Sequence, residues 1–256
     1  MAVREEMRVA GHTYAFRDRP LGDALDALRD AGFELVEVWL GHLRMSCDEV
    51  AAALAARRLC AVAVSAGGFY APGEAAATQA FALAQAIGAP VVVACVSPLV
   101  LGEVVRAVPE DVTLCIENHW DQPLDRPGAV GAALAASGSL AACLDTGHAI
   151  LAGVAPERFA AALGSRLAHV HLKEARSPAL PVRLLGRRAR LRLLGRPAPA
   201  FPGEGALSVA RLRAALAAAS YTGVVTLEHE GADAGRALAT LLSAWRAAGA
   251  GSQKAV

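Results

Sequence analysis

The sequence predicts an α/β fold: a single (β/α)8 barrel, or TIM barrel, formed by one domain over residues 1–256. Three observations support it: eight apolar runs, helical Ala/Leu patterns between them, and a length of 256 residues, close to the roughly 250 typical of such barrels. We expect the core over about residues 8–248 and a flexible tail at 249–256. The alternative, an open doubly wound sheet, usually has a Gly-rich turn after its first strand, and GHTYAFRD (11–18) is no such turn.

The predicted strands are short runs rich in apolar and β-branched residues, as in parallel strands that are buried on both faces. They cover residues 8–16, 33–40, 59–66, 89–97, 112–118, 140–146, 167–173 and 223–230. Parallel neighbours need a crossover connection, usually a helix, and the intervals between these runs are long enough to hold one.

The predicted helices repeat Ala and Leu with a helical period. Outside the fourth unit they cover residues 21–32, 46–58, 73–89, 126–137, 156–165, 208–220 and 234–249. Ser46 is a candidate N-cap, and Pro156 suits a first helical turn. Gly32, Gly88 and Gly164 stand where C-caps are expected.

Two segments depart from the regular repeat. Between Ser97 and Val112 there is room only for a short helix within residues 99–108, so the fourth βα unit is predicted to be shortened. Before strand eight, residues 177–205 are predicted to form a long loop or short hairpin over the barrel mouth. Its Arg-rich part, 183–196, is either a solvated excursion or an anion-facing lid or oligomer contact.

Composition indicates a globular protein and excludes several functional classes. The chain is 55% hydrophobic and 19% charged with a net charge of +1, so no strong field attracts nucleic acid or an anionic membrane. We find no apolar run long enough for a membrane span and no apolar region of a secretory signal at the N-terminus. We therefore expect a cytoplasmic protein whose five cysteines, which lack CxxC spacing, are reduced core thiols.

Polar side chains end four consecutive predicted strands, five to eight. These ends are LCIENHW (114–120), ACLDTGHA (142–149), AHVHLKEA (168–175) and VVTLEHEG (224–231). In a barrel the C-terminal ends of the strands meet at one mouth, where active sites lie. Because a buried carboxylate without a partner is costly, four such ends in one domain indicate a shared cation.

One residue from each strand end is a candidate metal ligand. The four candidates are Glu117, Asp145, His171 and Glu228. Each alone has an ordinary explanation as a salt-bridge partner, a helix cap or a core histidine. Together, three neighbouring carboxylates repel one another, and a divalent cation relieves that repulsion. One imidazole with three oxygen ligands suits Mn²⁺, Mg²⁺ or Co²⁺, with Zn²⁺ as a further candidate.

These motifs resemble those of the xylose isomerase-like TIM-barrel superfamily, the sugar phosphate isomerase/epimerase group. There, one divalent metal is held by a Glu ending strand five (IEN), the Asp of DTGH, the His of H-x-K-D/E and a Glu ending strand eight. The resemblance covers roughly residues 8–248 and implies the same four ligands here. It assigns the strand-seven ligand to His171 rather than His169, because LKE follows His171.

The resemblance implies a divalent-metal-dependent isomerase or epimerase of a small sugar or hydroxy-ketone. In ketose epimerases of this group the two metal-binding glutamates transfer the proton through a metal-bound enediolate, which assigns that role to Glu117 and Glu228. His148 and Lys173 are expected to bind substrate oxygens or the developing enediolate.

Four further residues near strand ends are candidate substrate contacts. They are Arg176, Asn118, Trp120 and His12. Arg176 is expected to hold a distal hydroxyl, carboxylate or phosphate, and Trp120 to stack on a sugar face. Asn118 is expected either to orient Glu117 or to bind substrate. Plain packing is the alternative for His12 and Trp120.

Other activities occur on the same scaffold. Inosose and dehydroshikimate dehydratases resemble this chain at the same four positions and share the proton abstraction, so the metal site does not separate them from isomerases. AP endonucleases need a three-zinc cluster with histidines on strands three and four, and residues 61–70 and 91–98 contain none. A non-catalytic metal-binding barrel is the last alternative. The expected partner is therefore a small molecule rather than nucleic acid or a membrane, with a homo-oligomer left open.

Overall fold

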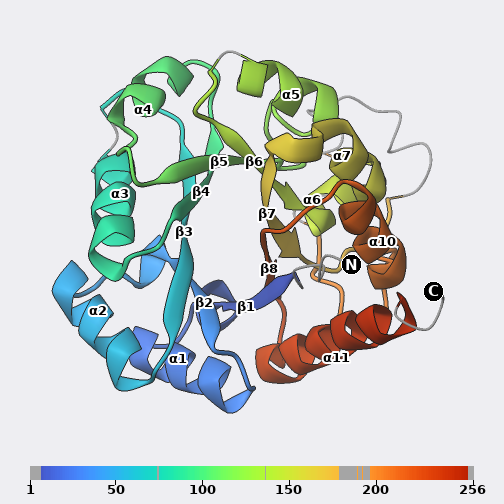
Figure 1. The fold of residues 1–256 in the computed structure, drawn as a ribbon, viewed down its shortest axis with the longest axis horizontal. Coiled ribbons are helices and arrows are strands. Elements are labelled where there is room, and N and C mark those ends of the chain that lie inside the picture. The colour runs from blue at the N-terminus through green and yellow to red at the C-terminus, as the bar shows by residue number, and fades with distance from the viewer. Residues whose placement is uncertain are drawn as a thin grey trace, which may run out of the picture.

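The computed structural model describes residues 7–73, 75–135, 137–178, 189, 192 and 197–252. Eight parallel strands form a closed barrel in which each strand pairs with the next and β8 pairs with β1. Figure 1 shows this ring of strands inside a ring of helices. The predicted (β/α)8 barrel is therefore confirmed.

Each strand lies in a predicted apolar run, except that the first ends at His12, before a 3-10 helix, and the third continues to Phe69, past its predicted end at residue 66. They are β1 (Arg8–His12), β2 (Leu35–Trp39), β3 (Cys60–Phe69), β4 (Val91–Val96), β5 (Thr113–Glu117), β6 (Ala141–Asp145), β7 (Leu167–Leu172) and β8 (Val224–Leu227). Their middle residues are mostly buried because one face lies inside the barrel and the other packs against helices. Closure also removes free strand edges.

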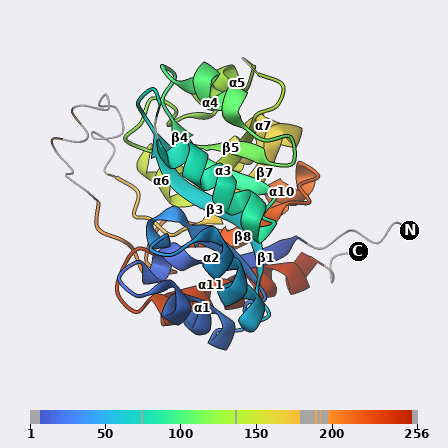
Figure 2. The ribbon, with the colours of Figure 1, turned by 90° about the vertical axis from the view of Figure 1, so that its left-hand side faces the viewer.

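The helices pack on the outside of the barrel. They are α1 (Leu21–Asp30), α2 (Cys47–Ala56), α3 (Ala75–Ile87), α4 (Leu101–Ala107), α5 (Pro127–Ala135), α6 (Thr146–Leu151), α7 (Pro156–Leu163), α10 (Val209–Ala218) and α11 (Ala234–Ser252). Short 3-10 helices are η1 (Thr13–Phe16), η2 (Leu40–His42) and η3 (Gly164–Arg166). Figure 2 shows the side on which α3 covers β3 and β4.

Local sequence explains several helix ends. The Ser46 hydroxyl accepts a hydrogen bond from the Glu49 amide, and the Glu49 carboxylate accepts one from the Ser46 amide, so a capping box starts α2. Pro156 occupies the first turn of α7. Gly88 and Gly164 follow α3 and α7 with positive φ angles of 65° and 51°, which glycine adopts without strain.

The fourth and sixth units differ from the regular repeat. The fourth is short, as predicted, because α4 has only seven residues. After β6 the chain forms an additional helix, α6, which was not predicted; its first residue, Thr146, was predicted to end strand six. The signal was weak because Thr146–His148 has no apolar period, and the helix begins on a side-chain cap supplied by Asp145.

The expected tail and loop are only partly described. Helix α11 continues through Ser252, three residues past its predicted end, so the first residues of the predicted tail are helical. Residues 253–256 lie outside the described residues. The Arg-rich segment 183–196 also lies outside them, apart from Ala189 and Arg192.

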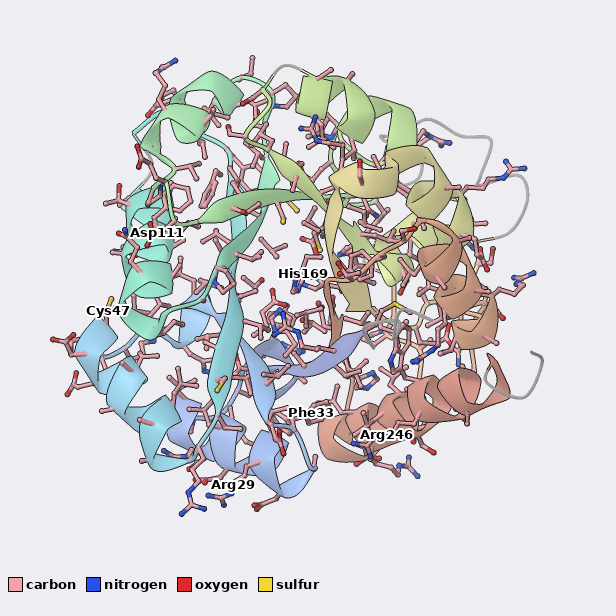
Figure 3. All side chains as sticks on the ribbon, in the orientation of Figure 1. Arg29, Phe33, Cys47, Asp111, His169 and Arg246 are labelled. Carbon is pink, nitrogen blue, oxygen red and sulfur yellow. The ribbon has the colours of Figure 1, made fainter. Side chains whose placement is uncertain are left out.

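The apolar core consists of one larger cluster and two smaller ones. The larger lies between the barrel and the helices, and its largest fully buried side chains include Trp245, Phe69 and Phe159. The smaller ones are Ala63, Val93, Cys115 and Cys143, inside the barrel, and Ala10, Val62 and Val224. Figure 3 shows the side chains that fill both spaces, with His169 near the centre of the barrel.

The cysteines are all free thiols, as predicted, but not all of them lie in the core. Cys95, Cys115 and Cys143 are buried, whereas Cys60 is exposed at the start of β3, so the prediction of a core thiol is wrong there. Every helix in the described part of the chain is too short or too polar to cross a membrane.

Leu28 tests the packing of α1 on the barrel. It is fully buried and lies so close to the backbone of β1 that a Cβ on Gly11 would stand 2.5 Å from its Cδ2 atom. We expect Leu28→Ala to lower the free energy of unfolding by about 2–5 kcal/mol, because the substitution leaves a cavity. Leu99→Ala, at a position that is 92% exposed, should change it by less than about 0.5 kcal/mol. Urea unfolding measures both, and equal losses would contradict this packing.

Candidate active site

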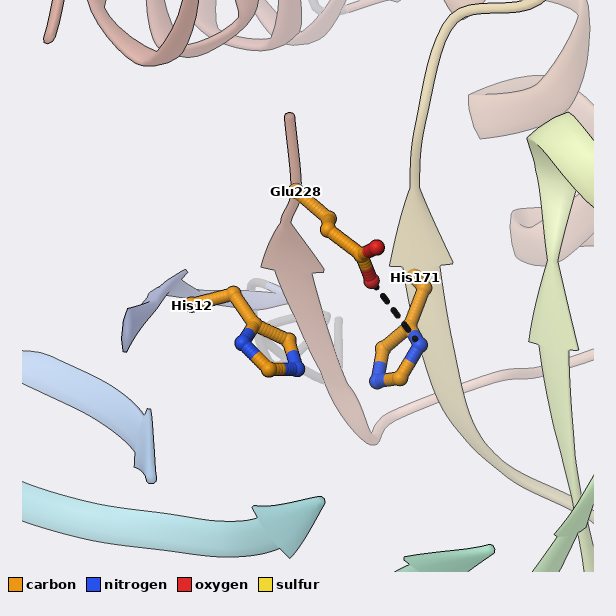
Figure 4. A group of neighbouring side chains, drawn as sticks. All are labelled: His12, His171 and Glu228. Atoms are coloured by element: carbon orange, nitrogen blue, oxygen red, sulfur yellow. Dashed lines mark ion pairs between the residues drawn. The ribbon is translucent and has the colours of Figure 1, made fainter. Parts of the chain in front are cut away.

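Three carboxylates surround one imidazole nitrogen at the C-terminal end of the barrel. Nδ1 of His171 lies 2.8 Å from Oε1 of Glu117 and 3.4 Å from Oε2 of Glu228. The same nitrogen lies 4.0 Å from Oδ2 of Asp145. Figure 4 shows the Glu228 carboxylate turned toward the His171 ring, with the His12 ring beside it. The structure therefore brings the four predicted ligands together.

Strand alternation and register explain this meeting. Glu117 ends β5 and Asp145 ends β6, and the residue two positions before each lies inside the barrel, so both carboxylates also point inward. Asp145 pairs directly with His171 in the register of β6 and β7. Glu228 follows the last residue of β8.

Asp145 carries the least compensated charge of this group. It has no exposed surface, and its Oδ1 accepts a 2.6 Å hydrogen bond from the amide of His148, which caps α6. Its Oδ2 has no hydrogen-bond partner. Burial raises the pKa of Asp145 to about 7, despite the nearby Lys173 ammonium. A buried carboxylate oxygen without a donor is what a cation ligand presents in a protein without its cation.

Asn118 positions Asp145. Its side-chain NH₂ donates to the Asp145 carbonyl at 3.0 Å, and its side-chain oxygen accepts from the Asp145 amide at 2.9 Å. The residue is only 1% exposed. The expected substrate contact of Asn118 is therefore corrected, because both ends of its amide are used to join the ends of β5 and β6.

Glu117 and Glu228 remain ionised although they are largely removed from water. Burial raises the pKa of Glu117, but the hydrogen bond and charge of His171 outweigh it, so the pKa lies below its usual value. Burial acts in the same way on Glu228, where the Lys173 ammonium, 2.8 Å from Oε1, outweighs it. Both carboxylates are therefore available as bases at neutral pH.

Lys173 supplies positive charge just after β7. Its Nζ atom contacts Glu228 and Glu230 and lies 3.7 Å from Oδ2 of Asp145. Burial lowers the pKa of Lys173, but the charges of Glu228 and Asp145 outweigh it and raise the pKa well above its usual value. The ammonium is thus charged and partly balances the carboxylates.

Two adjoining cavities open onto this group. One of about 240 Å³ is lined by Glu117, Glu228 and His12 among others, and one of about 350 Å³ is lined by Trp120 and the segment 197–200 among others. The residues that line both are His119, His148, Lys173 and Glu230. The cavities therefore form one cleft beside the carboxylates.

Most predicted substrate contacts lie in this cleft, and Arg176 does not. His12, Trp120, His148 and Lys173 line it. The Arg176 side chain is 62% exposed, and its guanidinium donates to Glu204 at 2.9 Å. Arg176 does not line either cavity, so its expected substrate contact is corrected to a surface ion pair.

His119 and Asp121 were missed by the sequence analysis. Nδ1 of His119 contacts Oδ1 of Asp121, and the His119 ring lies 3.7 Å, centroid to centroid, from that of His148. Burial lowers the pKa of His119, but Asp121 and Glu117 outweigh it, so the pKa lies above its usual value. An acid two residues after a histidine is a weak signal, because such pairs are common in loops.

Glu37 was also missed. It lies within β2, has no exposed surface, and contacts Nε2 of His169 at 2.8 Å and Nε2 of His171 at 3.0 Å. The signal was present in FELVEVWL (33–40), where one carboxylate interrupts a buried apolar run.

Comparison with known families agrees with this geometry. The model of the xylose isomerase-like TIM barrel family matches residues 25–248. The chain belongs to this family. The match includes all four strand ends that carry the carboxylates and His171. A search of curated proteins finds no significant match.

Solved structures share the fold of this family member at low sequence identity. An L-ribulose 3-epimerase is 17% identical with a TM-score of 0.71, covering 97% of both chains. The probable 3-DHS dehydratase AsbF from Bacillus anthracis is 16% identical with a TM-score of 0.70, covering 94% of this chain and 98% of its own. The 3-keto-D-glucoside 4-epimerase YcjR from E. coli is 15% identical with a TM-score of 0.70, covering 94% and 100%. Epimerases and a probable dehydratase thus share this barrel.

The side chains present fit a divalent cation. Three groups of candidate ligands in the described residues have donor atoms within 4.8 Å of one another; each contains His171, one adds Glu228 and another adds Glu117, and none includes Asp145. Carboxylate oxygens with one imidazole form a mainly hard donor set, suited to Mg²⁺, Mn²⁺ or Co²⁺. Oδ2 of Asp145 lies 4.0 Å from Nδ1 of His171 and accepts no hydrogen bond, so it is a further oxygen that could bind the cation.

Asp145→Asn should stabilise the metal-free protein. The folded-state pKa of Asp145, about 7, exceeds its unfolded value of 3.8, so its ionisation opposes folding fully above about pH 7 and not at all below about pH 4. In EDTA at pH 8 we expect the variant to melt several degrees above wild type, because each kcal/mol of added stability raises the melting temperature by about 2–4 °C. The difference should vanish toward pH 4. Calorimetric melting across this pH range measures the effect.

Adding metal should make wild type melt at a higher temperature than Asp145→Asn. Mn²⁺ should raise the melting temperature of wild type and not that of Asp145→Asn, because a ligand stabilises only the form that binds it. The control, Asp30→Asn, changes a side chain that is 70% exposed and should follow wild type throughout. A variant less stable than wild type in EDTA at pH 8 would contradict the uncompensated charge.

Proposed function

We propose that this protein is a divalent-metal-dependent isomerase or epimerase of a small sugar or hydroxy-ketone. The observation that carries the proposal is the pair of glutamates on one imidazole nitrogen. Glu117 ends β5 and Glu228 follows β8, and both carboxylates lie within 3.4 Å of Nδ1 of His171. Two ionised bases beside one cavity are what proton transfer between two faces of a carbon, or between neighbouring carbons, requires.

The proposed ligands of the cation are one side chain from each of four strand ends. They are Glu117, Asp145, His171 and Glu228. When bound, the cation supplies a Lewis acid that polarises a substrate carbonyl and makes the adjacent C–H acidic. Its positive charge also matches the carboxylates that Lys173 balances only in part.

The protein's own groups carry the proton and hold the substrate. One of Glu117 and Glu228 accepts the proton from the carbon next to the carbonyl, and the other returns it. Lys173 and His148 line the same cavity as the two glutamates, where they can hold substrate oxygens, and the Lys173 ammonium favours the negative charge that develops on them. The low exposure of these groups limits the water around them and strengthens their electrostatic effect on the substrate.

A dehydratase is the second candidate, because of His119 and Asp121. Dehydration begins with the same proton abstraction, and the departing hydroxide then needs a proton. His119 is held by Asp121 and lines both cavities, so it is placed to supply that proton. The described residues that line the two cavities include no arginine, the side chain that best matches a substrate carboxylate, and this favours the isomerase or epimerase.

Glu117→Gln and Glu228→Gln test the proton transfer. With Mn²⁺ present, wild type is incubated in deuterium oxide with a panel of ketoses, inosose and dehydroshikimate, and proton NMR reads exchange, epimerisation and dehydration separately. We expect at least one of the two variants to lose solvent exchange by about 10²–10⁴-fold while remaining folded, because a general base is removed. The exposed control Glu110→Gln should exchange as wild type does. Full exchange in both variants would rule out the glutamates as bases.

His119→Gln separates the two candidate reactions. If the protein is an isomerase or epimerase, we expect the rate at which the variant forms the isomer or epimer to lie within about tenfold of wild type, since neither proton transfer uses His119. The same NMR assay measures this. If the variant keeps solvent exchange but loses formation of a dehydrated product that wild type makes, the reaction is instead a dehydration.

A further inference from the structure

A carboxylate inside the barrel joins three histidines from other strands. Glu37, on β2, has no exposed surface. Its Oε1 lies 3.0 Å from Nε2 of His171 and 3.6 Å from Nε2 of His12. Its Oε2 lies 2.8 Å from Nε2 of His169. No part of the proton transfer described above uses this residue, although burying a carboxylate so deeply is costly.

These contacts decide which nitrogen of His171 keeps its proton when the other binds a cation. A carboxylate only accepts hydrogen bonds, so Nε2 of His171 must donate to Glu37. Nδ1 also faces carboxylates, Glu117 at 2.8 Å and Glu228 at 3.4 Å, so without a cation it too carries a proton, which it donates to Glu117. A cation held by these carboxylates would take the place of that proton, and the lone pair of Nδ1 would bind it while Nε2 keeps its proton. We infer that Glu37 is a positioning residue that holds His171 in the Nε2–H tautomer and offers Nδ1 to a divalent cation. This inference rests on the proposed metal-dependent function.

His169 completes the arrangement. Its Nε2 lies 2.8 Å from Oε2 of Glu37 and 2.9 Å from Oγ1 of Thr226. His169 and His171 are two residues apart on β7, so both enter the barrel interior from the same strand. His171 therefore faces the strand-end carboxylates, while His169 contacts the other oxygen of Glu37 and fixes the position of that carboxylate.

Both oxygens of Glu37 are needed for this role. Glutamine has the same shape but only one acceptor, so its NH₂ group would face an imidazole N–H. If that group faced His171, the ring would have to move its proton to Nδ1 and lose the lone pair offered to the cation. If it faced His169, one of the bonds that fix the position of residue 37 would be lost.

A purely structural role makes a different prediction. Buried ion pairs contribute little to net stability, and breaking one destabilises the fold without regard to any ligand. In that case Glu37→Gln would shift unfolding but leave the metal affinity of the folded protein unchanged. Metal affinity and the tautomer of His171 therefore distinguish positioning from structural support.

The test titrates Mn²⁺ into the full-length wild type, Glu37→Gln and Glu34→Gln by calorimetry. Glu34 is exposed just before β2 and provides a matched control. We expect the dissociation constant of Glu37→Gln to rise about 10–100-fold and that of Glu34→Gln to equal wild type. Equal affinity in Glu37→Gln and wild type overturns the inference alone. Failure of wild type to bind Mn²⁺, Mg²⁺ or Co²⁺ overturns the proposed function, and the inference with it.

A second measurement needs no variant and applies even if Glu37→Gln does not fold. Wild type with ¹⁵N-labelled histidine is loaded with Zn²⁺, which is diamagnetic, and the ring nitrogens are observed by NMR. We expect His171 to be protonated on Nε2 and coordinated through Nδ1. Protonation on Nδ1 with coordination through Nε2 overturns the inference.

Discussion

The structure depends on one constraint: closure of the barrel brings three carboxylates together in a place with little access to water. Eight parallel strands in a closed ring bring the ends of β5 to β8 to one mouth, and these ends carry Glu117, Asp145 and Glu228 around Nδ1 of His171. The strands are buried on both faces, so solvent can do little to screen these charges. Protein groups compensate the two glutamates but leave Oδ2 of Asp145 without a donor.

The carboxylates of this site differ in how far neighbouring groups compensate their charge. Deeper in the barrel, Glu37 is matched by His169 and His171, and nearer the mouth Glu228 is matched by Lys173. Oδ2 of Asp145, in contrast, is buried without a hydrogen-bond partner. Such incomplete satisfaction is typical of functional sites, which natural proteins retain at a cost in stability. The same feature that weakens the metal-free fold is therefore the one that would bind a cation.

Much of the fold, and the meeting of Glu117, Asp145, His171 and Glu228, could be predicted from the sequence, because apolar runs mark strands and strand ends mark the mouth. Contacts across the barrel could not, since pairing such as that of Glu37 with His169 joins residues far apart in sequence. Asn118 and Arg176 show the other limit. Their position near strand ends suggested substrate contact, but a backbone bridge in one case and a surface ion pair in the other depend on the exact path of the chain.

The central claim is that a single divalent cation lies where four strand ends meet. Anomalous X-ray scattering from crystals soaked in Mn²⁺ tests it most directly, because the signal locates the metal without assuming its ligands. The account predicts one strong peak per chain, bounded by Nδ1 of His171 and the carboxylates of Glu117, Asp145 and Glu228. A peak elsewhere, several peaks in a cluster, or no peak at saturating Mn²⁺ would contradict it.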